Sequence, residues 1–214
     1  MAELVDGFTV REASGALGVS RVRIQHMITD ESIGAELVGS RWIIPRHEVF
    51  RIQRLPRHSG RPYSPDTCWE IIDDLEAGRR PLGWLSEHWY RLTGRARHTT
   101  GRMLPDLIAD VFDDQRVVLG GAHAAAIRGA ATRPFHPPLD VYVADALASS
   151  YPFSIGLRPF TAEPNVTVHT VTHQQWENFG QSRTMSLVVA YLDLMEAGDR
   201  GAAEVYRLLQ SGRQ

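Results

Sequence analysis

The stretch that most constrains the fold is ELVGSRWIIP, residues 36–45. Two short apolar runs flank the dipeptide Gly39-Ser40, and a proline closes the segment. Glycine at the first central position of a two-residue loop is typical of a type II′ turn, whose twist matches that of the flanking strands. The sequence therefore predicts a small β-hairpin that carries Arg41 just after its tip. We expect Trp42 and Ile44, which alternate with Ile43, to pin it to a core.

Two short helices are predicted before this hairpin. Thr9, with Glu12 three residues later, forms a capping box, and Gly18 favours the left-handed conformation that ends a helix. Ser20 is a suitable N-cap for a second helix over residues 20–32. About three residues separate the helices, which is the usual length of the turn in a helix-turn-helix. Each helix has an apolar face, made of Val10, Ala13 and Leu17 in the first and Ile24, Met27 and Ile28 in the second.

The second helix carries an unusual set of polar side chains in its first two turns: Arg21, Arg23, Gln25 and His26. In a helix-turn-helix, this part of the second helix contacts base edges in the major groove, where arginine suits guanine and glutamine suits adenine. We expect these four residues to contact bases, Ser20 to hold a phosphate and Arg41 to contact DNA from the hairpin. The alternative is an ordinary solvated helix that happens to carry two arginines.

A third helix is predicted after Pro45, packing through Val49, Phe50 and Ile52. The pattern over residues 8–54 resembles the excisionase/MerR-type DNA-binding domain. The matching positions are Thr9, Glu12, Ala13, Leu17, Gly18, Val19, Ser20, Gly39, Arg41, Trp42, Ile44 and Pro45. The resemblance implies a winged helix-turn-helix in which the hairpin is the wing. The chain departs from the pattern at Glu36-Leu37-Val38, where relatives usually carry a basic residue. No long heptad helix follows, so the coiled-coil dimerisation of MerR activators is not implied.

Residues 56–66 are rich in proline, glycine and serine, a composition typical of a linker. We expect one domain over residues 1–55 and another over residues 67–214, beginning with a helix. Residues 79–102 hold six arginines against one glutamate, with Trp and Tyr among them. Such a segment is typical of a nucleic-acid surface, but a helix that buries Leu85, Trp89 and Leu92 is the favoured alternative. The candidate auxiliary phosphate contacts are Arg57, Arg61, Arg95 and Arg97.

Residues 116–143 predict a strand at 117–119, the pair Gly120-Gly121, a helix of small residues and a second strand around 140–143. Glycines between a strand and a helix let backbone amides approach a phosphate. The arrangement resembles the core of small nucleotidyltransferases, in which a Gly-Gly turn precedes a strand that bears two carboxylates for metal-bound nucleotide. Here Asp140 is followed by Tyr142 where the second carboxylate is expected. We therefore expect a scaffold without catalytic residues, metal or cofactor.

The remaining segments predict a strand over residues 165–171, an apolar helix over 184–198 and a terminal helix over 198–210, after short helices such as residues 104–114. The fold class is therefore mixed α/β (α+β), with an N-terminal winged helix-turn-helix joined to a mixed α/β domain. His123, His136, His169 and His173 lie in separate elements, which argues against a histidine metal site.

A weaker resemblance covers most of residues 8–210. RPYSPDTCWEII, VVLGGAHAAAIRGA and VVAYLDLMEAGDRGAAEVYRLL are similar to segments of actinobacterial AbiE-type antitoxins of type IV toxin–antitoxin pairs. The resemblance implies that the N-terminal domain represses its own promoter. It also implies that the C-terminal domain counters a nucleotidyltransferase-like toxin protein.

Composition excludes some kinds of site and indicates the cellular compartment. The single cysteine, Cys68, excludes an internal disulfide and a cysteine-based zinc site. No apolar run of about 18 residues is present, so we expect no contact with a membrane. The first residues do not resemble a secretory signal, and we expect a cytoplasmic protein.

The function expected from these features is a sequence-specific repressor of transcription that binds double-stranded DNA, without enzymatic activity. It would act as an autoregulating antitoxin if the second resemblance holds, and a homodimer on DNA would improve specificity. One alternative is an excisionase-type recombination accessory factor. Another is a degenerate nucleotidyltransferase-like protein targeted by its DNA-binding domain.

Overall fold

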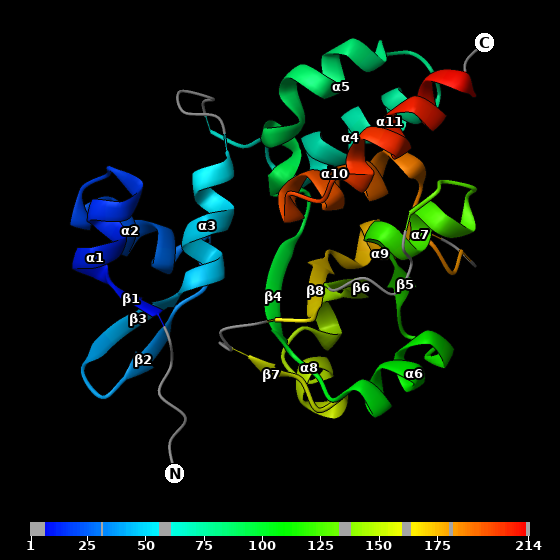
Figure 1. The fold of residues 1–214 in the computed structure, drawn as a ribbon. Helices are drawn as coiled ribbons and strands as arrows, with labels where there is room; N and C mark the ends of the chain where they lie inside the picture. The colour runs from blue at the N-terminus through cyan, green and yellow to red at the C-terminus, as the bar shows by residue number, and fades with distance from the viewer. Residues whose placement is uncertain are drawn as a thin grey trace.

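The computed structural model describes residues 7–30, 32–55, 61–132, 138–159, 164–179 and 182–212. These residues form a mixed α/β fold with two separate sheets, as the sequence predicted (Figure 1). A three-stranded sheet has the order β1-β3-β2, and a five-stranded sheet has the order β5-β6-β8-β4-β7. We call residues 7–55, with the smaller sheet, the first unit, and residues 61–212, with the larger sheet, the second unit.

The first unit contains three helices and a hairpin. In chain order these are β1 (Gly7–Thr9), α1 (Val10–Leu17), α2 (Arg21–Thr29), β2 (Glu36–Val38), β3 (Arg41–Pro45) and α3 (Arg46–Arg54). The predicted capping box of Thr9 and Glu12 is present, and Ser20 caps α2 by accepting from the Arg23 amide. Val38 pairs with Arg41, so Gly39-Ser40 is a two-residue loop, and Gly39 has φ +64° as a primed hairpin turn requires.

The core of the first unit is small and confirms most of the predicted apolar positions. It contains Ala13, Ile24, Met27, Ile33, Ile44 and Val49. Two expectations were wrong. Trp42 is 39% exposed because it pairs with the exposed Leu37 toward the tip of the hairpin, whereas Ile44 and Pro45 at the end of β3 are buried. Phe50 is 46% exposed because α3 turns Val49 inward and Phe50 away.

The second unit begins inside the predicted linker. Residues 56–60 of that linker lie outside the described residues, and α4 (Pro65–Glu76) already starts two residues before the predicted domain boundary, capped by Ser64. The helices that follow are α5 (Leu82–His88), the 3-10 helix η1 (Trp89–Arg95), α6 (Pro105–Asp113), α7 (Gly121–Ile127), the 3-10 helix η2 (Asp145–Leu147), α8 (Tyr151–Ser154), α9 (His173–Asn178), α10 (Leu187–Ala197) and α11 (Gly201–Ser211).

The larger sheet combines strands from distant parts of the chain. Its members are β4 (Arg97–Arg102), β5 (Val118–Leu119), β6 (Leu139–Ala144), β7 (Arg158–Pro159) and β8 (Val166–Val171). β6 and β8 run parallel, and the other neighbouring pairs are antiparallel. One face is apolar and packs with α6 and α8 through side chains that include Leu139, Val141, Val143, Val166 and Val168.

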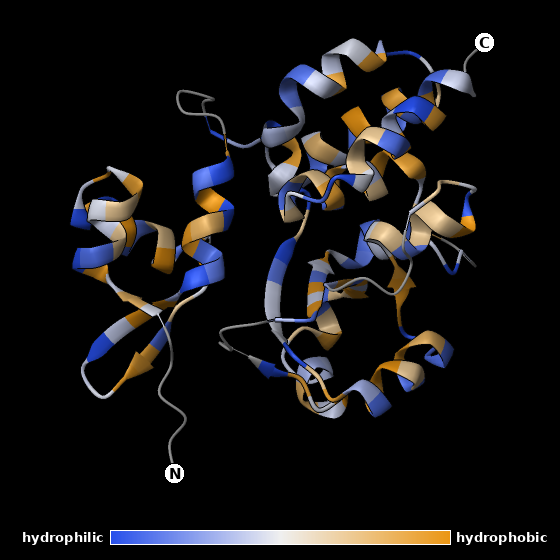
Figure 2. Ribbon diagram, viewed as in Figure 1, coloured by the Kyte–Doolittle hydropathy of each residue, from blue (hydrophilic) through white to orange (hydrophobic). Residues whose placement is uncertain are grey.

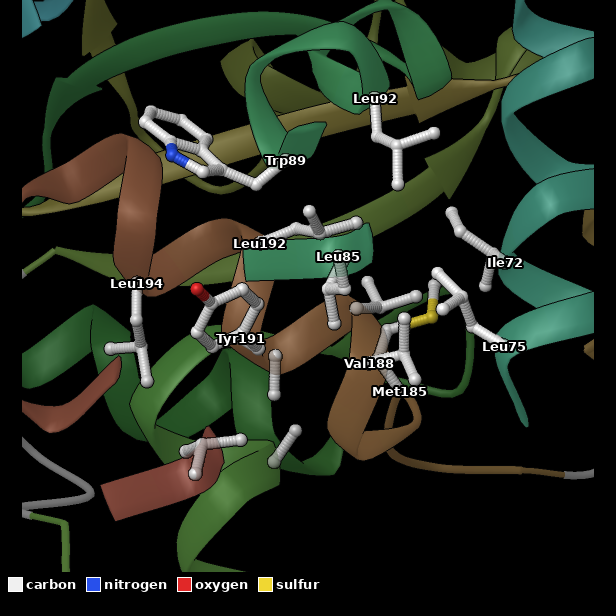
Figure 3. Close-up of a cluster of buried hydrophobic side chains, with 14 of the residues drawn as sticks. Ile72, Leu75, Leu85, Trp89, Leu92, Met185, Val188, Tyr191, Leu192 and Leu194 are labelled. Carbon is white, nitrogen blue, oxygen red and sulfur yellow. The ribbon is translucent and has the colours of Figure 1, made fainter. Parts of the chain in front are cut away.

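The helical part of the second unit forms its largest core, around α10 (Figure 3). Leu85, Trp89 and Leu92 are buried there, which confirms the predicted core helix in residues 79–102. The same segment continues into β4, a strand that the sequence did not predict. β4 is mostly polar, and its hydrophilic colour contrasts with the hydrophobic β5 in Figure 2.

Among the helices of the described residues, none has both the length and the apolar character that a membrane span requires.

The cores imply a testable difference between two leucines of the second unit. Leu192 is fully buried on α10, whereas Leu104 is 59% exposed. We expect Leu192→Ala to lower the free energy of unfolding by about 2–5 kcal/mol, because the substitution leaves a cavity. Leu104→Ala should change it by less than about 0.5 kcal/mol. Urea unfolding of both variants measures this, and equal effects would contradict the described packing.

Candidate functional site

The exposed face of α2 holds the residues that were expected to contact DNA bases. Ile24 and Met27 are buried in the first unit, and Arg21, Arg23, Gln25 and His26 are all exposed. The turn at residues 18–20 is short because Gly18 ends α1 with φ +66° and Ser20 immediately starts α2. The structure therefore brings these four side chains together on the first turns of one helix.

The other expected DNA contacts are dispersed. Arg41 is exposed next to the hairpin tip, opposite Val38. Arg61 is exposed near the start of the second unit, and Arg97 is exposed at the start of β4. Arg57 lies outside the described residues.

The expectation that Arg95 contacts a phosphate was wrong. Its side chain is only 2% exposed, so it does not reach the surface. The guanidinium group lies 2.5 Å from Asp193 and also pairs with Glu196 on α10. It donates further to the Leu92 carbonyl and to the Tyr142 hydroxyl. Burial alone lowers the pKa of Arg95, but these anionic partners outweigh burial and raise it well above its ordinary range.

Arg95 belongs to a cluster of buried polar groups on the second face of the larger sheet. The strand register explains the cluster, because residues directly opposite each other project from the same face. Asp140, Thr167 and Thr100 are in register across β6, β8 and β4. Tyr142, His169 and His98 form the next row on the same strands. The alternation in residues 166–171, which the sequence predicted as a strand, places Thr167 and His169 here.

The pair Gly120-Gly121 lies against the carboxylates of this cluster. The Gly121 amide donates to Asp193 Oδ2 at 2.8 Å. A Cβ atom on Gly120 would lie 2.6 Å from that same oxygen, and one on Gly121 would collide with the Asp140 carboxylate. The glycines therefore let the backbone approach two carboxylates. The sequence suggested that backbone amides at these glycines could bind a phosphate. In the structure, the Gly121 amide instead donates to the side chain of Asp193.

Tyr142 and His169 complete the cluster. The Tyr142 hydroxyl donates to Asp193 Oδ1 at 2.6 Å. The His169 ring stacks on Tyr142 at 4.5 Å between centroids, and its Nε2 atom lies 2.9 Å from Asp140 Oδ1. Burial raises the pKa of Asp140 to about 6. Burial lowers the pKa of His169, but Asp140 and Asp193 outweigh it, so that the net shift is upward.

A cavity of about 170 Å³ lies over this polar face, between α3 and the second unit. From the second unit it is lined by residues that include His98, Thr100, Asp140, His169, Asp193 and Glu196. The α3 side contributes His47, Glu48, Arg51 and Arg54. Arg54 also donates to the Ala197 carbonyl at the end of α10. In Figure 1, α3 stands between the second unit and the pair α1 and α2.

Glu48 is the buried anion of the α3 wall. Its carboxylate accepts from the Gly34 amide at 2.9 Å and from Arg51 at 3.0 Å, and it lies 3.5 Å from His98 of the second unit. Burial raises the pKa of Glu48, but Arg51 and the hydrogen bond from His98 outweigh burial and hold it well below its ordinary value. Burial lowers the pKa of His98.

Sequence reasoning missed this cavity because its residues come from five distant segments. It correctly placed His123, His169 and His173 in separate elements, and His136 lies outside the described residues. It did not predict that His169 is buried beside Asp140 and Asp193. The available signal was a histidine and a carboxylate on two strands whose other face is apolar.

A buried and an exposed arginine, each paired with a carboxylate, should contribute differently to the free energy of unfolding. We expect Arg95→Met to lower the free energy of unfolding by about 3–5 kcal/mol, because it leaves buried carboxylates without their cation. Arg79 pairs with Asp74 at 2.7 Å on the surface, where the Arg79 side chain is 61% exposed. Arg79→Met should cost less than about 1 kcal/mol. Chemical unfolding at pH 7 measures both, and a small loss for Arg95→Met would contradict the network.

The second prediction concerns acid stability. Because the folded-state pKa of Glu48 is lowered, its ionisation stabilises the fold above the ordinary value of 4.5, and this contribution is lost as the pH falls through the folded-state pKa. Glu48→Gln should lower the free energy of unfolding by at least about 1.5 kcal/mol at pH 7. The difference from the native chain should shrink below pH 4.5.

Unfolding curves between pH 3 and 7 test this, with the exposed Glu177 as the control position. Glu177→Gln should leave the pH dependence unchanged. A constant difference between Glu48→Gln and the native chain at every pH would exclude the proposed ionisation.

Comparison with known proteins assigns neither a family nor a function to the chain. No protein-family model matches the chain, and no curated protein or solved structure is significantly similar to it. The resemblances to the excisionase/MerR-type domain and to AbiE-type antitoxins therefore stay predictions.

Proposed function

We propose that the first unit is a winged helix-turn-helix that binds double-stranded DNA in a sequence-specific manner through α2. One observation carries the proposal. Arg21, Arg23, Gln25 and His26 are exposed together on the first turns of a helix that follows another helix after only residues 18–20. Helices in this arrangement enter the major groove with their N-terminal residues at the base edges. Arginine and glutamine there can each form two hydrogen bonds with one base.

The position of the hairpin and one of its side chains support its assignment as a wing. It follows α2 directly in the chain, and Arg41 is exposed next to its tip as a phosphate contact. Leu37, Val38 and Trp42 are exposed on the same hairpin. Relatives of the predicted family usually carry a basic residue in the strand that is Glu36-Leu37-Val38 here, so Arg41 would supply the positive charge of the wing.

The second unit contacts the proposed DNA-binding unit and could regulate its binding to DNA. The two are joined through the chain and contact each other at α3, where Arg54 and Glu48 interact with the second unit. We infer a transcriptional repressor, since a unit bound to promoter DNA blocks polymerase without further chemistry. One α2 helix contacts few base pairs, so binding as a dimer or to repeated sites would raise specificity. An antitoxin role stays a prediction from the resemblance.

The proposal predicts that DNA binding depends on two arginines of α2. Bound sequences would first be selected from a library of random DNA duplexes with the full chain. We expect Arg21→Ala with Arg23→Ala to weaken binding to the selected site by at least about 30-fold, because each base contact by arginine contributes ~1–3 kcal/mol. A gel-shift titration measures the loss, and circular dichroism checks the fold.

The matched control removes the same charge elsewhere. Arg200 and Arg207 are exposed at the far end of the second unit, so Arg200→Ala with Arg207→Ala should bind the selected site as the native chain does. Equal losses in both double variants would mean that binding is a general effect of charge. Failure to select any sequence would refute the proposal.

The selected sites also separate the repressor from its alternative. Cooperative binding to tandem repeats beside a recombination site would favour an excisionase-type accessory factor. Binding to a palindrome in a promoter would favour the repressor.

A further inference from the structure

Three side chains with metal-ligating atoms meet at the floor of the cavity. Asp140 on β6, His169 on β8 and Asp193 on α10 are all buried. One ligand atom from each lies within 4.8 Å of those from the other two. The three residues come from separate elements, and all three line the cavity between α3 and the second unit.

We propose that Asp140, His169 and Asp193 bind a divalent first-row transition-metal ion, with water from the cavity completing its coordination. One imidazole nitrogen and two carboxylate oxygens form a donor set that suits ions such as Zn²⁺, Mn²⁺ and Co²⁺. The inference is independent of DNA binding, because none of the three residues lies in the first unit.

The distances are compatible with such an ion. Tetrahedral coordination with bonds of about 2.0–2.1 Å places ligand atoms roughly 3.3 Å apart. His169 Nε2 lies 2.9 Å from Asp140 Oδ1 and 4.0 Å from Asp193 Oδ1, on either side of that value. Small side-chain shifts would equalise the distances. The Nε2 atom releases its proton to solvent when it becomes a ligand.

The charge of the cluster favours a cation. Asp193 and Glu196 share the single guanidinium of Arg95. Within the described residues, the Asp140 carboxylate has one hydrogen-bond partner, the His169 ring. Burying several carboxylates together is costly when few cations accompany them. A divalent ion between Asp140 and Asp193 would add positive charge where these two carboxylates meet the His169 ring.

Asp193 is held in place by groups that are not ligands. Tyr142 donates to its Oδ1 atom at 2.6 Å, Arg95 contacts the same oxygen at 2.5 Å, and the Gly121 amide donates to Oδ2 at 2.8 Å. Hydrogen bonds of this kind orient the ligands of metal sites and tune the affinity of the site. Tyr142 is therefore a positioning residue of the proposed site.

The test is metal binding by the full chain. Protein freed of metal with a chelator would be titrated calorimetrically with Zn²⁺ and with Co²⁺, and the visible spectrum of the Co²⁺ form would be recorded. We expect one ion per chain in the site. Asp140→Asn and His169→Asn should each weaken binding at least about 10-fold, and Tyr142→Phe, which removes only a hydroxyl, should weaken it by about 10–100-fold.

A surface pair provides the control. His173 lies 3.2 Å from Glu177 on α9, and both are exposed. His173→Asn should leave the titration and the Co²⁺ spectrum unchanged. The absence of binding by the native chain, or native-like binding by both Asp140→Asn and His169→Asn, would overturn the proposal.

A second measurement on the native chain covers the case in which the variants fail to fold. Crystals grown with Co²⁺ should show an anomalous peak within bonding distance of both Asp140 and His169. A peak only at His173 and Glu177, or none, would overturn the proposal as well.

Discussion

The second unit is organised around the buried ion pair of Arg95 and Asp193. The pair joins the end of η1 to α10, and it lies where the helical core meets the polar face of the larger sheet. Removing two charges from water is costly, so the pair is stable only when its remaining hydrogen-bonding atoms have partners. Leu92, Glu196, Tyr142 and the Gly121 amide supply them. The ion pair therefore determines which residues fit at several positions around it.

The features that could be predicted from the sequence are local ones. The capping box at Thr9, the two-residue loop at Gly39 and the alternation in residues 166–171 each depend on residues close together in the chain, and each is present. The burial of Arg95 could not be predicted from neighbouring residues in the chain. In an arginine-rich segment it is indistinguishable from its exposed neighbours, because its burial depends on carboxylates about a hundred residues away in α10. β4 was missed for the same reason, since the partners of its polar residues lie on β8 and α3.

The two faces of the larger sheet explain why the second unit has both a conventional core and a polar cavity. Odd-numbered residues of β6 face α6 and α8 and are apolar, whereas Asp140 and Tyr142 face the other way. The same alternation in β8 adds His169 to that side. The resemblance to nucleotidyltransferases depended on Gly120-Gly121 and Asp140. The structure uses the glycines to contact Asp193, an acidic residue from a helix.

The helix α3 has a different environment on each of its sides. Val49 belongs to the core of the first unit, whereas Glu48, Arg51 and Arg54 line the cavity shared with the second unit. The contact between the units at α3 therefore includes charged and hydrogen-bonded side chains, and Leu55, just after α3, packs against the helical core of the second unit. Opening this boundary would expose the buried carboxylate of Glu48 and the apolar side chain of Leu55. Because Glu48 accepts from the Gly34 amide within the first unit and lies 3.5 Å from His98 of the second, a change on the shared surface also acts on the fold of the first unit.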